Sequence, residues 1–353
     1  MSRWWTKGAP HPGKRLRARE RKLSAPRLLA PLAPLAPLAP FALLALGFAA
    51  SCGSSVIGEE PAPAKRIALI APVHAGELGD AMRLGAEAAA KEFGVELAYA
   101  AFEPEEGAVI QRATALQTLK DGVSALLIDP ADGEVLRAVA DRASRSGVPV
   151  LALNDERTDK GVLASIAVDN EEAGRKAGEA MAKLLGGDGA VAVLGPARND
   201  PDVARREAGV VAALSDYPDI RIARKAACGD SLSPCRQAVR QLLDGGAIDG
   251  IFALDAPTSI AAAEESAVPG RRGGLKIVTF GGELAQLELL QDGIIHTSVV
   301  QNGFSTGYLG VKQAVALLEG QRIDQSTRIE TKVIDAENMF WMDNQKLLFP
   351  FVQ

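Results

Sequence analysis

"GVSALLIDP", residues 122–130, contains the type of segment that decides the fold of this chain. Residues 125–129 are predicted as a strand, because they form a short apolar run that ends in one acid. A segment with helical spacing, 111–120, precedes this run, and another, 134–146, follows it. A short unbroken apolar run between helices is typical of a parallel sheet that helices cover on both faces.

The same alternation continues in both directions along the chain. Strands are predicted in two series, at 66–71, 96–101, 125–129, 148–153 and 165–169, and then at 190–195, 220–227, 250–254, 276–280 and 296–301. Helices are predicted at 78–93, 111–120, 134–146, 171–185, 203–215, 235–243, 259–268, 283–292 and 307–319. This pattern predicts an α/β protein with two doubly wound, Rossmann-like parallel-sheet lobes. Ligands bind beyond the carboxyl ends of such strands, so the two lobes are expected to share one cleft.

The N-terminal region has the layout of an export signal. Residues 1–27 carry nine Lys or Arg and a single acid, and an apolar stretch, 28–50, follows them. Small residues then precede Cys52, whose thiol can accept a lipid once the chain is cut before it. This order resembles the bacterial lipobox, although Ala49 stands where that motif prefers Leu. The resemblance implies a signal peptide, 1–51, and lipid attachment at Cys52.

Two other interpretations of this region stay open. A membrane-spanning helix needs about 20 apolar residues, but each proline of the LAPLAPLAPLAP run costs roughly 3 kcal/mol inside a helix. A later start codon would shorten the basic leader and keep the rest of the pattern. Residues 52–64 are rich in Ser, Gly, Pro and Glu and are predicted to be a flexible tether. The protein is therefore expected in the cell envelope, periplasmic or extracytoplasmic, and attached to the membrane through its lipid only.

The charge of the chain argues against nucleic-acid binding. The 353 residues carry a formal net charge of −5, and removal of the leader's surplus of eight positive charges brings this to about −13. An acidic protein lacks the basic surface that phosphate backbones require. No nucleic-acid partner is therefore expected.

Two cysteines follow Cys52 in the sequence. Cys228 and Cys235 have a spacing that is uncommon in zinc sites, and no His lies near them. In an oxidising compartment they are expected to form a disulfide that closes a small loop and stabilises the fold by roughly 2–3 kcal/mol. The alternative is two reduced thiols that never pair.

The sequence shows no catalytic constellation. Its three His are His11 in the leader, His74 in the first predicted loop and His296 at the start of a strand. No G-x-S-x-G or H-E-x-x-H motif is present, and no paired metal ligands stand out. The glycine-rich segment 186–189 precedes a strand, whereas a dinucleotide-binding loop follows one. We therefore expect no enzyme, no cofactor and no metal; a hydrolase is a distant alternative.

Short motifs along the chain occur in the order of one known family. The segment 82–86, MRLGA, is similar to that family's M-K-x-G-A, and 122–130 is similar to its G-V-D-A-I-L-I-N-P. Further similar segments are SGVPV at 146–150, VDN at 168–170 with Gly174 and Gly178, IFA at 251–253, VTFGG at 278–282, VVQ at 299–301, and Glu337 with Asn338. Together they resemble the ribose-type sugar-binding proteins of bacterial ABC transporters, in the periplasmic binding protein type 1 family.

The resemblance implies two discontinuous lobes that are joined by a three-strand hinge. The N-terminal lobe would comprise 65–168 plus 302–328, and the C-terminal lobe 169–301 plus 329–353. The resemblance also implies a monomer that delivers its ligand to an ABC permease.

The polar part of the family's sugar site is partly retained. Arg206 falls where the family has an Arg that reaches the ligand, and it is the only base expected there. Asp129 stands for the Asn of I-N-P, Asp255 stands for the Asn of F-A-x-N-D, and Gln301 is kept. Three of these residues also have an interpretation without a ligand: Arg206 as a solvated helix charge, Asp129 as a turn residue and Asp255 as a helix cap.

The apolar part of that site is missing. His74 and Glu77 lie in a loop where the family has N-x-P-F-F, so both stacking rings are absent. Asn154 and Asp155 replace the D-R of L-D-R, and Gly281 replaces the acid of F-D-G. We therefore expect a ligand other than ribose, a small polar molecule such as a modified sugar or an amine-bearing compound.

These observations predict a lipid-anchored solute-binding protein that captures a small, sugar-like ligand between its lobes and delivers it to an ABC permease. The alternative is a ligand-sensing module for a chemotaxis or two-component receptor, which neighbouring genes would distinguish. LacI-type repressors share the implied fold but begin with a helix-turn-helix, where this chain has an export signal.

Overall fold

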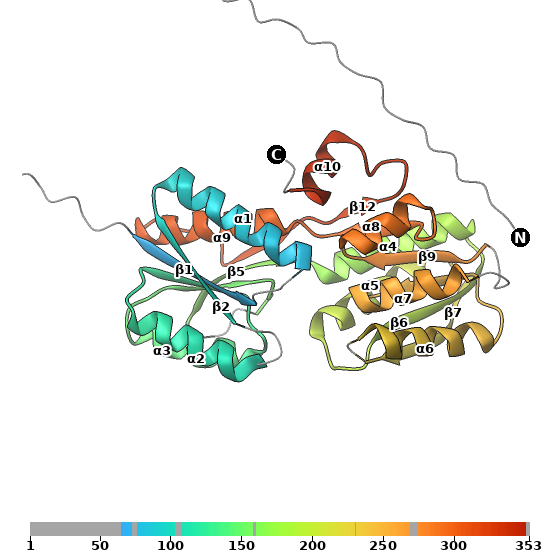
Figure 1. Cartoon of the computed structure of the whole chain (residues 1–353), viewed down its shortest axis with the longest axis horizontal. Coiled ribbons are helices and arrows are strands. Elements are labelled where there is room, and N and C mark those ends of the chain that lie inside the picture. The colour runs from blue at the N-terminus through green and yellow to red at the C-terminus, as the bar shows by residue number, and fades with distance from the viewer. Residues whose placement is uncertain are drawn as a thin grey trace, which may run out of the picture. The chain divides into compact units, whose positions relative to one another are not determined.

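The computed structural model describes residues 65–72, 76–102, 107–157, 160–229, 231–268 and 274–350. The predicted signal peptide, the predicted lipidation site Cys52 and the predicted tether lie outside these residues. Each predicted strand and helix overlaps an observed one (Figure 1). None of the described helices is long and apolar enough to cross a membrane.

The first sheet contains six strands in the order β11-β5-β4-β3-β1-β2, and all of its pairings are parallel. Its strands are β1 (Arg66–Pro72), β2 (Glu96–Phe102), β3 (Ala125–Ile128), β4 (Val150–Leu153), β5 (Val162–Val168) and β11 (Ser326–Ile329). Every residue of the central strands β3 and β4 is buried. This agrees with the unbroken apolar run from which the sheet was predicted.

The second sheet has the same size and the order β12-β10-β9-β8-β6-β7. Its strands are β6 (Gly189–Pro196), β7 (Ile220–Cys228), β8 (Gly250–Ala253), β9 (Lys276–Phe280), β10 (Thr297–Val300) and β12 (Lys332–Ile334). Only β12 runs antiparallel to its neighbour; the other pairings are parallel. Figure 1 shows helices above and below each sheet.

The helices around the first sheet are α1 (Gly76–Phe93), α2 (Gly107–Lys120), α3 (Gly133–Ser144) and α9 (Gly303–Leu318). Those of the second are α4 (Asn170–Leu185), α5 (Pro201–Leu214), α6 (Leu232–Asp244), α7 (Ala256–Ser266), α8 (Leu284–Gln291) and α10 (Met342–Leu348). The chain passes between the sheets after β5, after β10 and after β11. The predicted fold class, two doubly wound lobes joined by a three-strand hinge, is therefore confirmed, whereas the residue boundaries of the lobes stay a prediction.

Equivalent helix pairs in the two lobes pack closely because glycines lie at their contacts. In the first lobe α1 packs against α9, and a Cβ at Gly85 would overlap the backbone carbonyl of Phe304. In the second lobe α4 packs against α5, and a Cβ at Gly209 would overlap the carbonyl of Glu171. These contacts place the N-terminal ends of α1 and α5 in equivalent positions of their lobes.

Three elements near the C-terminus were not predicted from the sequence: β11, β12 and α10. β11 and β12 are short and largely exposed, so they lack the apolar run that identifies a buried strand. α10 has only seven residues, too few for a helical period to be recognised. The start of β5 also differs from the prediction: the strand begins at Val162, whereas the predicted strand begins at residue 165.

Cys228 and Cys235 form a disulfide in the structure, with their Cα atoms 4.8 Å apart. The bond connects the last residue of β7 to the first turn of α6. Both cysteines are buried, at 4% and 0% exposure. The disulfide thus fixes the loop between a strand and a helix at the carboxyl edge of the second sheet.

Candidate ligand-binding site

The predicted ligand-binding residues follow the carboxyl ends of strands in both sheets, with two exceptions on helices and one undescribed residue. Asp129 follows β3, Asn154 and Asp155 follow β4, Asp255 follows β8 and Gln301 follows β10. Glu77 lies in the first turn of α1 and Arg206 in α5. His74 lies outside the described residues. The arrangement is the one expected for open α/β sheets, whose ligand sites lie beyond the strand ends.

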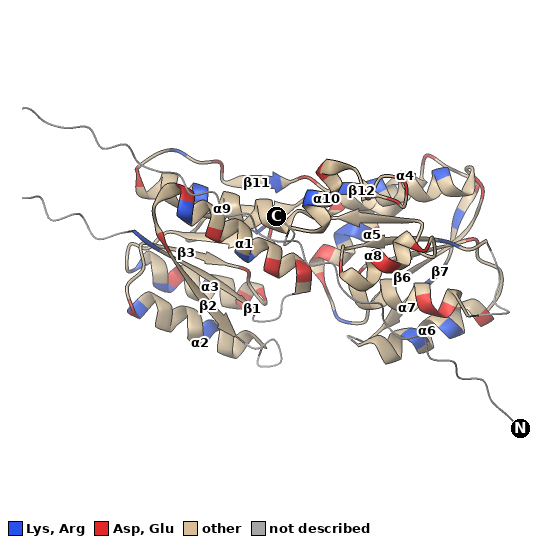
Figure 2. Ribbon diagram, turned by 45° about the horizontal axis from the view of Figure 1, so that its top comes forward, with Lys and Arg blue, Asp and Glu red and all other residues tan. Residues whose placement is uncertain are grey.

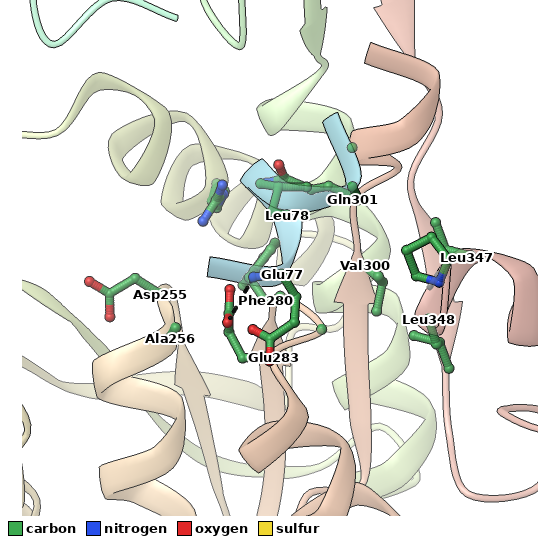
Figure 3. A pocket seen from close by; sticks show the side chains of 16 residues that line it. Glu77, Leu78, Asp255, Ala256, Phe280, Glu283, Val300, Gln301, Leu347 and Leu348 are labelled. Atoms are coloured by element: carbon green, nitrogen blue, oxygen red, sulfur yellow. Dashed lines mark hydrogen bonds between the residues drawn. The ribbon is translucent and has the colours of Figure 1, made fainter. Parts of the chain in front are cut away.

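A cavity of about 170 Å³ lies between the two lobes (Figure 3). Its polar lining includes four of the predicted residues and one that was not predicted: Glu77, Arg206, Asp255, Gln301 and Glu283. Its larger apolar side chains are Leu78, Phe280, Val300, Leu347, Leu348 and Pro350. Pockets for drug-sized ligands measure roughly 300–1,000 Å³, so this cavity suits a smaller molecule.

Arg206 is held in position from inside its own lobe. Its Nε donates to Oδ1 of Asn170 at 2.8 Å, and its Nη1 donates to the backbone carbonyl of Leu254 at 2.8 Å. The guanidinium lies over the ring of Phe280, 5.2 Å from its centre. Burial lowers the pKa of Arg206, and the carboxylates of Asp202, Asp200 and Asp255 oppose that shift. Arg206 is therefore a fixed side chain in the cavity wall, in contrast to a solvated helix charge.

Asp255 both caps a helix and lines the cavity. Its side chain accepts from the backbone N–H of Thr258 at 3.0 Å, and Thr258 closes the capping box by accepting from the backbone N–H of Asp255 at 3.1 Å. The helix-cap alternative from the sequence thus describes a contact that is present. Since Asp255 also borders the cavity, capping fixes the carboxylate that a ligand would meet.

Asp129 and Asn154 form a hydrogen-bonded pair in the first lobe. Asn154 Nδ2 donates to Oδ2 of Asp129 at 3.1 Å, and the backbone of Asn154 has a positive φ of 52°. Asn accepts this conformation more readily than most residues. The pKa of Asp129 is raised to about 7, chiefly by burial and also by the charges of Asp155 and Asp202, whereas the Asn154 hydrogen bond lowers it. Neither residue of the pair lines the cavity itself.

Asp155 has a partner that the sequence did not suggest. Arg157 donates its Nε to Oδ1 of Asp155 at 2.8 Å, and it also pairs with the other carboxylate oxygen. Asp155 is only 7% exposed. Arg157 thus takes up the carboxylate of Asp155, whereas Arg206 is the only base among the described residues that line the cavity. The proposed contact of Asp155 with a ligand stays a prediction.

Glu77 and Glu283 bond to each other's helix across the two lobes. The backbone N–H of Glu77 donates to Oε2 of Glu283 at 3.3 Å, and the backbone N–H of Leu284 donates to Oε1 of Glu77 at 3.2 Å. Each carboxylate thus accepts from the first turn of the other lobe's helix, where backbone N–H groups lack helical partners. Figure 2 shows acidic residues at the end of α1 that lies nearest the second lobe.

Sequence reasoning missed Asn170, Glu283 and the leucines of α10 as site residues. Asn170 was noted only as part of a motif; its amide, 4% exposed, supports Arg206. Glu283 begins the predicted helix 283–292, where an acid is common, so no local signal marks it as a site residue. Among the described residues no group of three or more His, Cys, Asp or Glu is placed to hold a metal ion.

The sequence is similar to those of several known binding proteins. Residues 67–322 match the periplasmic binding protein domain family. The D-ribose/D-allose-binding protein of Pseudomonas aeruginosa is 27% identical over 301 residues, which cover 79% of this chain and 91% of that protein. The xylitol-binding protein of Mycolicibacterium smegmatis is 26% identical over 58% of this chain, and the match spans only 59% of that relative.

A solved structure is similar over almost its full length. An ABC-transporter solute-binding protein from Burkholderia graminis, in complex with D-arabinose, has a TM-score of 0.71 and 26% identity, covering 78% of this chain and 97% of that one. The motif order in the sequence and the two-sheet topology agree with this match. The chain belongs to the periplasmic binding protein family, type 1, of the ribose type.

Proposed function

We propose that this chain is the solute-binding protein of an ABC transporter. It captures a small, sugar-like polar ligand in the cavity between its lobes and delivers it to a permease. Cleavage of the signal peptide makes Cys52 the N-terminal residue, and a lipid on this cysteine keeps the protein at the membrane. This tether raises the effective concentration of the loaded protein near its transporter.

The observation that carries this proposal is the anchoring of Arg206 in the cavity wall. Two hydrogen bonds of 2.8 Å and the ring of Phe280 fix its guanidinium before any ligand enters. Its Nη2 has no hydrogen-bond partner among the described residues, so this donor is available to a ligand hydroxyl. A preorganised charged donor binds without a further loss of side-chain entropy.

Polar groups around Arg206 provide the acceptors that a polyhydroxylated molecule needs. Asp255, Gln301 and Glu77 border the same cavity and come from three different elements. A hydroxyl that leaves water needs a replacement partner, since burial without one costs about 1–3 kcal/mol. This set of carboxylates, an amide and a guanidinium supports capture of a molecule with several hydroxyls.

Titration calorimetry of the purified protein against monosaccharides and polyols tests the proposal. The panel contains D-ribose, D-allose, D-arabinose, D-galactose, D-fucose and xylitol, with small amines as a separate set. We expect at least one sugar or polyol to bind with micromolar or tighter affinity. Binding of amines alone, or of no member of either set, would contradict a sugar-like ligand.

The proposed anchor has its own test. Cys52→Ala removes the thiol that would carry the lipid, so the protein should move from the membrane fraction to the soluble extracytoplasmic fraction. Ser51→Ala, a small-residue exchange beside it, serves as the matched control and should stay with the membrane. Equal membrane association of the Cys52→Ala protein would refute lipid attachment at this residue.

A further inference from the structure

The end of the described chain reaches the ligand cavity. Leu347 and Leu348 of α10, followed by Pro350, line the cavity beside Val300 of β10 (Figure 3). The match to the binding-protein family ends at residue 322. This wall of the cavity is therefore built from a part of the chain that the family match does not include.

α10 is attached firmly to the second lobe. Leu348 is 6% exposed and belongs to the same hydrophobic cluster as Val300 and Met339. One turn before Leu348, the buried Asn344 donates its Nδ2 to the carbonyl of Asn338 at 2.9 Å. These contacts make the leucines of α10 a fixed part of the wall.

Leu348 also packs near the loop that follows β9. A Cβ on Gly282 would lie 3.1 Å from Cγ1 of Val300 and 3.7 Å from Cδ2 of Leu348. The preceding residue is Gly281, so neither position carries a side chain, and Glu283 is the first residue of this loop to bring a carboxylate to the cavity. Methyl groups of Val300 and Leu348 thus lie close to a pair of glycines.

The cavity consequently has two chemically different sides. In Figure 3, Asp255 lies on one side and Leu347 and Leu348 lie on the opposite side, beyond Val300. Arg206 lines the cavity together with Asp255 and contributes a charged donor. A ligand that fills this cavity would meet Arg206 and Asp255 at one edge and aliphatic side chains at the other, with Glu77, Glu283 and Gln301 also in the lining.

We propose that the ligand is a deoxy sugar or deoxy polyol, a molecule with hydroxyls along one edge and a methyl group on the other. The aliphatic wall from Leu347 to Pro350 selects for the methyl group. A hydroxyl at that wall would lose its hydrogen bonds to water without replacement, whereas a methyl group gains from leaving water. This inference rests on the proposed sugar-binding function and specifies its substrate class.

Matched ligand pairs test the inference. Calorimetry compares D-fucose with D-galactose, and L-rhamnose with L-mannose, since each pair differs only by the hydroxyl on C6. For a pair that binds, we expect the deoxy member to bind about five- to tenfold more tightly. A parent sugar that binds as tightly as its deoxy partner, or more tightly, overturns this inference and leaves the proposed function standing. Binding of no sugar or polyol overturns the proposed function, and this inference with it.

Variants of α10 assign the preference to the wall. Leu347→Gln places a hydrogen-bonding group on a half-buried position and should reduce the deoxy preference to less than about twofold. Met342→Gln, on the same helix but 72% exposed, is the matched control and should keep the full preference. Leu348→Ala should also weaken the preference, and its thermal unfolding curve shows whether α10 is still in place. An unchanged preference in a folded Leu347→Gln protein overturns the role of the wall.

Discussion

The first-lobe wall of the cavity includes Glu77 of α1, and the second-lobe wall includes Arg206 of α5. Both helices belong to equivalent helix pairs, yet the two side chains are held in different ways. Arg206 of α5 donates hydrogen bonds to Asn170 and to the backbone carbonyl of Leu254, inside the second lobe. Glu77 of α1 bonds instead to the first turn of α8, in the other lobe. Arg206 is therefore held from within its own lobe, whereas Glu77 and Glu283 are held by hydrogen bonds between the lobes.

The two kinds of contact are therefore expected to affect ligand binding in different ways, one through recognition of the ligand and the other through closure of the lobes. A side chain that is fixed before binding contributes affinity without the entropy loss of ordering it. A contact that forms only between lobes contributes to the stability of the closed form, and so to how long a ligand is retained. We expect changes in the second lobe to alter affinity strongly and changes at Glu77 to alter it weakly.

The largest expected effect concerns the shared helix packing. Gly85→Ala and Gly209→Ala each place a Cβ against backbone of the partner helix, so each should lower the free energy of unfolding by about 2–3 kcal/mol in urea titrations. Gly195→Ala, whose Cβ would meet only side chains at 3.5 Å and 3.6 Å, is the control and should cost less than about 1 kcal/mol. Strongly unequal losses in the two lobes would break the equivalence of the helix pairs.

The second effect concerns the preorganised wall. Arg206→Met removes a charged donor, so affinity for the tightest sugar of the panel should fall about 10- to 100-fold in calorimetry. Arg205→Met is the control on the same helix, because Arg205 pairs with Glu156 at 2.8 Å and does not line the cavity. Equal losses of affinity in Arg206→Met and Arg205→Met would show that the positive charge of α5, and not contact of Arg206 with the ligand, determines the affinity.

A third prediction concerns pH and the acid of the first lobe. The pKa of Asp129 is about 7 in the folded protein against 3.8 ordinarily, so the folded state holds this proton more tightly than the unfolded chain. The resulting stabilisation is complete below pH 4 and is lost as pH rises from about 4 to 7. Asp129→Asn should abolish this part of the pH dependence and raise the melting temperature at pH 8 by a few degrees.

Melting curves from pH 4 to 8 compare the two proteins. Asp132→Asn serves as a control acid, because Asp132 caps α3 at the surface. A wild-type stability that rises through this window relative to Asp129→Asn would contradict a raised pKa.

The smallest effect is expected at the contact between the lobes. Glu77→Ala removes the acceptor of the Leu284 N–H, and affinity should fall about two- to fivefold, mainly through faster release of the ligand. Glu77→Gln keeps a carbonyl oxygen in place and should stay near the wild-type value. A loss at Glu77→Ala as large as that at Arg206→Met would remove the distinction between the walls.

Much of the fold could be predicted because buried parallel strands leave a direct trace in the sequence. The apolar runs at β3 and β8, for example, correspond to strands whose residues are all buried. The short strand β11 leaves no such trace, because it is mostly exposed and is recognised only by its pairing with β5. Such elements depend on neighbours that are distant in the sequence.

The site was predictable to the extent that its residues follow strands or match a motif. Asp255 and Gln301 were found because they stand at motif positions of the family, one just after a predicted strand and one at the end of a predicted strand, and both line the cavity. Arg157 was missed, although it lies only two residues beyond Asp155, because nothing local shows which carboxylate an arginine will pair with. Glu283 and Leu348 meet the cavity only through packing between distant segments.

The sequence by itself determined the α/β class, the succession of strands and helices and the order of the family's motifs. These properties depend on side-chain periodicity and on local backbone preferences, which neighbouring residues encode. Only the tertiary structure decided that Arg206 is fixed by Asn170, that Glu77 bonds to the other lobe and that α10 forms an aliphatic wall of the cavity. Each of these contacts joins residues far apart in the chain, and no local pattern constrains such distances until the whole fold has formed.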